Sequence, residues 1–206
     1  MNNTIKLLLL SDLFVATGFG LIGPIFAIFV KDNIAGGTIF TAGVASTIYL
    51  LVKSTTQLPF SRYVDKHDNK VGWLLIGAFL TVLTPILYLF STNIYHIYAA
   101  QVLYGIGGAL AFPTWLALWS INLDKKHEGY EWSLYSTATG LGTAGTAAIG
   151  GAIAEFIGFA YTLFFVAIIS VIGWLILFGL RKKSIKEDGV RSAHYHKHRK
   201  LKGENQ

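Results

Sequence analysis

The chain has 206 residues, of which 53% are hydrophobic and only 14% are charged, and its mean hydropathy is +0.52. Soluble domains carry roughly 25% charged residues, so this composition excludes an ordinary soluble protein and indicates a membrane protein. The absence of cysteine excludes disulfides, iron–sulfur clusters and thiolate metal sites. A net charge of +6 raises nucleic acid as a partner, but the placement of the basic residues favours a membrane topology signal instead.

Six apolar stretches follow one another along the chain, and each is long enough to cross a bilayer. A hydrocarbon core about 30 Å thick needs roughly 20 helical residues. The stretches are Leu7–Val30, Thr38–Phe60, Val71–Ser91, Tyr95–Ile121, Ser133–Glu155 and Ile157–Leu180. We therefore expect an all-α integral membrane protein whose six-helix transmembrane domain covers residues 1–180. The first stretch is too long for a cleavable signal peptide, so we expect it to be retained.

Basic residues gather in alternate connections, which predicts the orientation of the chain in the membrane. One side holds Lys6, Arg62, Lys66, Lys70, Lys125, Lys126, Arg181, Lys182, Lys183 and Lys186, and the other holds Lys31 alone. We expect a multi-pass protein of the plasma membrane with both termini in the cytoplasm. Residues 181–206 are expected to form a basic, disordered cytoplasmic tail, with anionic-lipid attraction or weak metal capture by its histidines as alternatives.

Two charged residues inside the spans are the strongest functional hints, because a charge in lipid is costly without a partner. Asp12 and Lys53 lie in helices of opposite direction, at depths of roughly 9 and 14 Å from the cytoplasmic end. We expect both side chains to face the protein interior and to be able to pair. Three alternatives stay open: a static ion pair that only orients the two helices, a role in coupling to an ion or substrate, and a Lys53 side chain that extends to the membrane interface.

Polar and aromatic residues extend this path along the second and fourth spans. The candidate substrate or ion path comprises Asp12, Tyr49, Lys53, Gln57, Gln101 and Tyr104. A membrane helix with a polar stripe of this kind is expected to face protein or water. Trp115 and Trp119, near the cytoplasmic end of the fourth span, are expected in packing or in an interfacial belt rather than in a binding cage.

Small side chains recur every four residues along the fifth span. They form one ridge, which consists of Ser136, Gly140, Ala144, Ala148 and Ala152. A ridge of this kind lets another helix approach closely. Packing within the chain and contact with a second subunit are both open at this point.

The connection between the second and third spans, residues 59–70, carries a recognisable pattern. Ser61 stands at a small position, Asp65 follows four residues later, Lys66 comes directly after it, and Lys70 ends the pattern. This pattern resembles the inner-loop motif of the major facilitator superfamily, with Asp68 and Asn69 in place of a glycine and an arginine. Residues 101–107 and 150–165 resemble the fourth-helix motif and the fifth-to-sixth helix turn of the same family. Gln101 stands where many proton-coupled members carry arginine.

The resemblance implies that the chain is a half-size member of the family, because most members have twelve helices in two six-helix halves. Two copies related by an axis along the membrane normal would then form the substrate path between them. The implied function is secondary transport of a small solute by alternating access, with or without a coupling ion, in a homodimer in contact with membrane lipid. No cofactor, metal or nucleic acid is implied.

The resemblance also implies a cytoplasmic gate that consists of Ser61, Arg62, Asp65, Lys66, Lys70 and Glu131. Asp65 would meet the start of the partner's fifth helix, near residues 130–133, where free N–H groups favour a carboxylate. Arg62 or Lys66 would meet Glu128 or Glu131 of the partner subunit. The alternative for this connection is a topology signal alone.

Two other functions remain open on the sequence. One is that of one half of a hetero-dimeric transporter. The other is that of a scaffold or lipid-binding protein that does not transport. An enzyme is not expected, because the sequence has no glycine-rich phosphate loop, no His-Glu-x-x-His run and no Gly-x-Ser-x-Gly turn. Without a nucleotide-binding domain, any active transport would draw on an ion gradient.

Overall fold

The described part of the chain is helical along nearly its whole length. The computed structural model describes residues 1–180, and the expected tail, residues 181–206, lies outside them. The elements are α1 (Asn3–Ile22), the 3-10 turn η1 (Gly23–Ile25), α2 (Phe26–Asn33), α3 (Ile39–Lys66), α4 (Lys70–Leu89), α5 (Ile94–Asn122), α6 (Glu128–Phe156) and a last helix, Phe159–Leu180. Each of the six apolar stretches of the sequence therefore coincides with a helical segment.

Side-chain caps explain where several of these helices begin. The Asn2, Asn69 and Asn93 side chains accept hydrogen bonds from backbone N–H groups in the first turns of α1, α4 and α5. Thr38 and Thr41 form a reciprocal capping box at the start of α3. These side chains satisfy N–H groups that have no partner within the helix, which matters most where water is scarce.

The first span is interrupted at Gly23-Pro24. The 3-10 turn η1 joins α1 to α2 there, with Pro24 in the first positions of the turn, where its missing N–H is tolerated. By contrast, α3, α4 and α5 continue through Pro59, Pro85 and Pro113. The first apolar stretch is therefore two helices in a row rather than one.

The helices differ in how well they suit lipid. Among residues 1–180, four segments are long and apolar enough to cross a membrane: Asn3–Asn33, Lys70–Leu89, Ile94–Asn122 and Phe159–Leu180. The helices α3 and α6 have 28 and 29 residues, so they are long enough but are too polar to join that group. Hydroxyl-bearing residues and Lys53 lower the hydropathy of α3, and hydroxyl-bearing residues and glycines lower that of α6.

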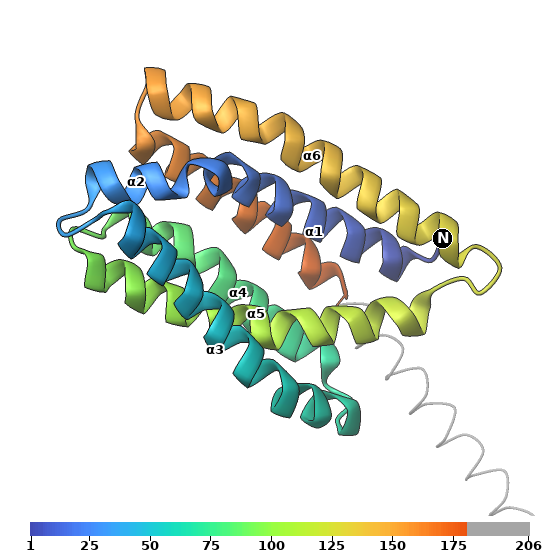
Figure 1. Cartoon of the computed structure of the whole chain (residues 1–206). Coiled ribbons are helices and arrows are strands. Elements are labelled where there is room, and N and C mark those ends of the chain that lie inside the picture. The colour runs from blue at the N-terminus through green and yellow to red at the C-terminus, as the bar shows by residue number, and fades with distance from the viewer. Residues whose placement is uncertain (181–206) are drawn as a thin grey trace, which may run out of the picture.

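The bundle has two groups of packed helices. α5 packs on both α3 and α4, while α1 packs on α6 and on the last helix (Figure 1). α1 also touches α5, so the four helices α6, α1, α5 and α3 follow one another across one side of the bundle. The Trp174 indole N–H donates to the Leu75 carbonyl, 3.0 Å away, and so joins the last helix to α4.

Two apolar clusters lie toward opposite ends of the bundle. One is built around Ile5, Leu8 and Trp119 near the N-terminus, and the other around Phe29, Val30 and Ile97. At the second end, the Ala35 N–H and C=O groups bond the backbone of Thr92 and Ile94 at 3.0 Å, which ties the α2–α3 connection to the α4–α5 connection. The bundle therefore has a separate apolar core toward each end.

Gly107 allows α4 and α5 to approach closely, and this contact can be tested. A Cβ atom at Gly107 would lie 2.9 Å from both the Gly77 carbonyl oxygen and the Thr81 amide nitrogen, so the α4 backbone would have to move. We expect Gly107→Ala to lower the free energy of unfolding by about 1–3 kcal/mol, as overpacking does. Thermal unfolding in lipid nanodiscs, followed by tryptophan fluorescence, measures the loss.

Gly129→Ala is the matched control, because nothing lies within 4 Å of a Cβ at that helical position. It should unfold at the wild-type temperature or slightly above, since alanine favours helix by about 1 kcal/mol over glycine. Equal unfolding temperatures for the two variants would contradict the proposed close contact.

Candidate functional site

A cavity of about 170 Å³ lies within the bundle and is lined by residues from six helices. We call it the Asp12 cavity. Its lining includes Asp12 of α1, Tyr49 and Lys53 of α3, Thr81 of α4, Tyr104, Phe112 and Trp115 of α5, Tyr135 of α6 and Leu177 of the last helix. The structure thus brings four of the six residues of the predicted path to one cavity.

Asp12 is held by a tyrosine. The Tyr135 hydroxyl donates to Asp12 Oδ2 at 2.7 Å, and this bond links α6 to α1. Asp12 therefore enters the cavity with one carboxylate oxygen already oriented by protein. Tyr135 is a site residue that the sequence analysis missed, because no spacing along the chain relates it to a residue 123 positions away.

Lys53 faces aromatic rings rather than a carboxylate. Its ammonium nitrogen lies 4.8 Å from the centre of the Phe112 ring and 5.8 Å from that of Tyr49. A cation over an aromatic face is attracted by the ring quadrupole. The expectation that Asp12 and Lys53 pair is corrected: the ion pairs among residues 1–180 join Met1 to Glu131 and Asp124 to His127. The two residues do share one cavity, as expected, but each has a different neighbour.

Three stacked rings separate this cavity from a second one. The Tyr104 ring stacks on Phe19 at 5.1 Å and on Tyr49 at 4.3 Å, with interplanar angles of 2° and 18°. Tyr49 and Tyr104 line both cavities. The stack therefore joins α1, α5 and α3 and forms the wall between the two spaces.

The second cavity, of about 330 Å³, lies toward the opposite end, near η1; we call it the Gln101 cavity. Gln101 is buried, with 5% of its surface exposed, and its side-chain oxygen has no hydrogen-bond partner among the described residues. Gln57, the remaining residue of the predicted path, lines neither cavity. The predicted path is thus found in two cavities, apart from Gln57.

The tryptophans of α5 pack, as expected. Trp115 and Trp119 stack on each other at 4.8 Å and contact Trp132 and Tyr135 of α6. Trp119 is fully buried, whereas Trp115 also reaches the wall of the Asp12 cavity. This cluster holds α6 against α5 beside Tyr135, and so positions the tyrosine for Asp12.

The predicted gating residues are helical rather than in a loop. α3 continues to Lys66, so Ser61, Arg62 and Asp65 occupy its last turns, and Lys70 already begins α4. The Arg62, Asp65 and Lys66 side chains are exposed. The Ser61 hydroxyl donates to the Leu58 carbonyl and the Lys70 ammonium to the His67 carbonyl. These contacts stay local, so a role at a gate remains a prediction.

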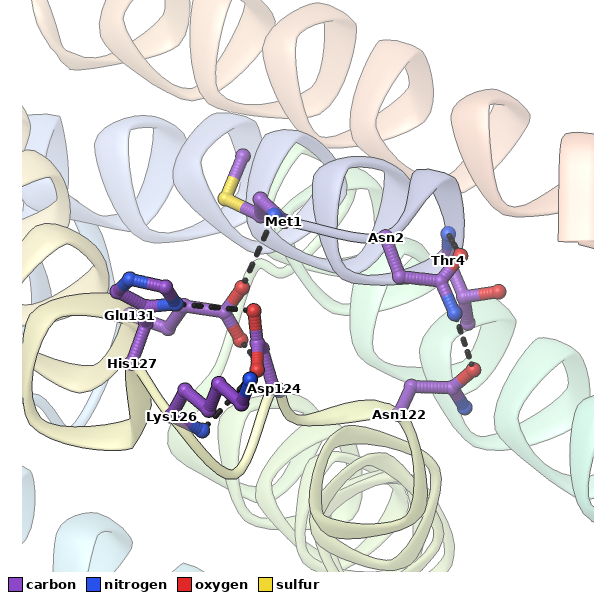
Figure 2. Close-up of polar contacts among 8 residues, drawn as sticks. All are labelled: Met1, Asn2, Thr4, Asn122, Asp124, Lys126, His127 and Glu131. Atoms are coloured by element: carbon purple, nitrogen blue, oxygen red, sulfur yellow. Dashed lines mark hydrogen bonds and ion pairs between the residues drawn. The ribbon is translucent and has the colours of Figure 1, made fainter.

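Glu131 differs from its expected place. It is 1% exposed, its carboxylate lies 3.5 Å from the Met1 amino group, and it accepts the Asp124 N–H at 3.3 Å (Figure 2). A side chain so enclosed is not available to Arg62 or Lys66 of the partner subunit in this conformation. The physical reason is that α6 begins beside α1, and Glu131 turns inward to it.

The same junction contains a second acid with local partners. Asp124 lies between α5 and α6, and its carboxylate is bonded by the His127 ring at 3.0 Å and by the Lys126 N–H at 3.0 Å (Figure 2). These contacts, that of His127 first, hold the pKa of the Asp124 carboxyl below its ordinary value. Asp124 is therefore expected to be ionised and to fix the turn that starts α6.

The ridge of small residues on α6 does not pack within the described chain. Gly142 and Gly150 face α1, where a Cβ would meet Thr17 and Leu21. The ridge lies on roughly the opposite side of α6, since two positions along a helix are about 200° apart. All five of its residues are exposed: Ser136, Gly140, Ala144, Ala148 and Ala152. Of the two alternatives, contact with a second subunit is the one left open.

Apolar helices around cavities that are lined by charged and aromatic residues are typical of a helical membrane protein. A family model described as the Major Facilitator Superfamily matches residues 8–202. The chain therefore belongs to the Major Facilitator Superfamily, a family of secondary membrane transporters, and the resemblance noted in the sequence is confirmed.

The bond between Tyr135 and Asp12 gives a direct test of this site. Removing the hydroxyl in Tyr135→Phe leaves the ring but takes away a hydrogen bond to a carboxylate, and such bonds contribute about 1.5–3 kcal/mol. We expect thermal stability in nanodiscs to fall by about 1.5 kcal/mol, because the cavity still offers water to Asp12. Tyr130→Phe is the control, since Tyr130 is exposed. A fall of the same size in both variants would show that the bond contributes nothing specific.

Proposed function

We propose that this protein is a transporter of a small solute that is completed by a second copy of itself and works by alternating access. The main observation in support of this proposal is that Asp12 and Lys53 line the same cavity in a member of a transporter family. In this family the substrate site lies between two six-helix halves, and one chain supplies one such bundle. Neither charge has an ionic partner among residues 1–180, which is costly for a purely structural element.

Two helices support the presence of a second copy. α3 and α6 lie at the two sides of the row α6–α1–α5–α3, and both are too polar to count among the lipid-suited helices (Figure 1). A twofold axis along the membrane normal would place α3 of one copy against α6 of the other, twice. The exposed small ridge of α6 would then allow the close approach that such a contact needs.

The orientation in the membrane follows from the basic residues. Lys6, the end of α3, the start of α4 and the α5–α6 junction carry most of the positive charge of residues 1–180. In a bundle of alternating helices these segments lie at one end, and we propose that this end faces the cytoplasm of a plasma-membrane protein. The Asp12 cavity is then nearer the cytoplasm, and the Gln101 cavity nearer the outside.

The stacked rings suggest how a solute is passed. Tyr49 and Tyr104 border both cavities, so a solute that moves from one to the other must pass these rings. When the two copies rock about the central axis, α3 moves relative to the partner and carries Tyr49 and Lys53 with it. A solute that binds the two states unequally shifts the equilibrium between them.

Dimer formation can be tested at the small ridge. Ala144→Trp places a large side chain where we propose that the partner's helix packs, and should convert dimers to monomers in nanodiscs. Native mass spectrometry measures the mass of the assembly. Ile172→Trp is the control, because Ile172 is exposed and belongs to the last helix, which is outside the proposed contact between α3 and α6.

We expect wild type and Ile172→Trp to be dimers. A wild-type monomer, or a dimer that Ala144→Trp leaves intact, would contradict the proposed interface. An unlike six-helix protein bound in place of the second copy would instead identify a hetero-dimer.

Gating by Asp65 can be tested with cysteines, because the chain has none of its own. Thr81→Cys reports on the Asp12 cavity and Ser46→Cys on the Gln101 cavity. Asp65→Asn should weaken the cytoplasmic gate, so labelling of Thr81→Cys by a membrane-impermeant thiol reagent from the cytoplasmic side should rise several-fold. Labelling of Ser46→Cys from the outside should fall.

Asp68→Asn is the matched control, since Asp68 is an exposed acid three residues further on. It should leave both labelling rates unchanged. If Asp65→Asn also leaves labelling and transport unchanged, the connection is a topology signal and not a gate.

A further inference from the structure

The Asp12 cavity contains two opposite charges that the protein does not use to neutralise each other. Asp12 accepts one hydrogen bond, from Tyr135, and the Lys53 ammonium faces the rings of Phe112 and Tyr49. Among residues 1–180 neither takes part in an ion pair. Taken alone, each charge would be expensive so deep in a membrane protein, so the cavity is arranged for something that offers both charges.

We propose that the Asp12 cavity binds a small zwitterion of the amino-acid type with an apolar, ring-sized side chain. This inference rests on the proposed function and names the class of solute. The ammonium of the ligand meets Asp12 and its carboxylate meets Lys53. A ligand with a cation alone is repelled by Lys53, and one with an anion alone is repelled by Asp12.

The size and lining of the cavity define the rest of the ligand. Aromatic side chains make up much of its wall, including Tyr104, Phe112 and Trp115. Its volume is about 170 Å³. An apolar cavity of about 150 Å³ in another protein holds one benzene ring. The space therefore suits one ring-sized group, and because the cavity is open rather than enclosed, the charged head of the ligand has room at its mouth.

The inference is tested by equilibrium binding to the full chain in nanodiscs. The three probes share one ring and differ in charge: L-phenylalanine is a zwitterion, phenethylamine a cation and 3-phenylpropionate an anion. We expect wild type to bind L-phenylalanine at least tenfold more tightly than either of the other two. Equal or tighter binding of a singly charged probe, or no binding of L-phenylalanine, overturns the proposal.

Charge-removing variants assign the two ends of the ligand. Lys53→Gln should weaken the binding of L-phenylalanine at least tenfold. It should leave the binding of phenethylamine as tight or tighter, because the repulsion between Lys53 and the ligand's ammonium is gone. Asp12→Asn should weaken the binding of L-phenylalanine by a similar factor and tighten the binding of 3-phenylpropionate. Lys31→Gln and Asp32→Asn are the controls, since both residues are exposed and outside the cavity. Equal shifts for all three probes in either variant would overturn the assignment.

The comparison of the three probes uses wild type, so it does not depend on whether a variant folds. Equilibrium binding is also measured without any transport. Loss of the zwitterion preference together with normal dimers and normal labelling would therefore overturn only the solute class. A tenfold preference for L-phenylalanine in a protein that is a monomer, or shows no change in labelling, would instead overturn the proposed mechanism and leave the ligand class standing.

Discussion

The structure depends on one constraint: a charged side chain inside a membrane protein must not face hydrocarbon. Asp12 and Lys53 both lie deep in helices, and both line one cavity in the bundle. The surrounding helices provide a tyrosine hydroxyl for the carboxylate and aromatic faces for the ammonium. Because Asp12 and Lys53 have different partners, they do not form an ion pair with each other, and both remain available in the cavity.

The same constraint divides the helices into two kinds. Four segments are apolar enough for contact with lipid, and they include the central α5 and the peripheral α4 and last helix. α3 and α6 are more polar and stand at the two ends of the row α6–α1–α5–α3, and their exposed residues include small and hydroxyl-bearing ones beside large apolar ones such as Leu51 and Leu141. A second copy that covers these faces would satisfy the constraint where lipid does not, which joins the proposed assembly to the chemistry of the cavity.

Aromatic residues do much of the positioning in this bundle. The stack of Phe19, Tyr104 and Tyr49 ties three helices together and separates the two cavities. The cluster of Trp115, Trp119 and Trp132 holds α6 so that Tyr135 reaches Asp12. Such rings bury large surfaces and keep a polar edge available, so they can pack and line a polar space at the same time.

The sequence by itself determined the helical segments and the family, because hydrophobic runs, helical spacing and short motifs are local properties of a chain. It grouped Asp12, Lys53 and Tyr104, which line one cavity, into a predicted path, but it did not identify Tyr135 or Phe112 as their contacts. It also placed Glu131 at a gate, whereas the structure encloses it between α1 and α6. Only the tertiary structure decided these contacts, because spacing fixes which face of one helix a residue occupies, while packing between helices decides what that face meets.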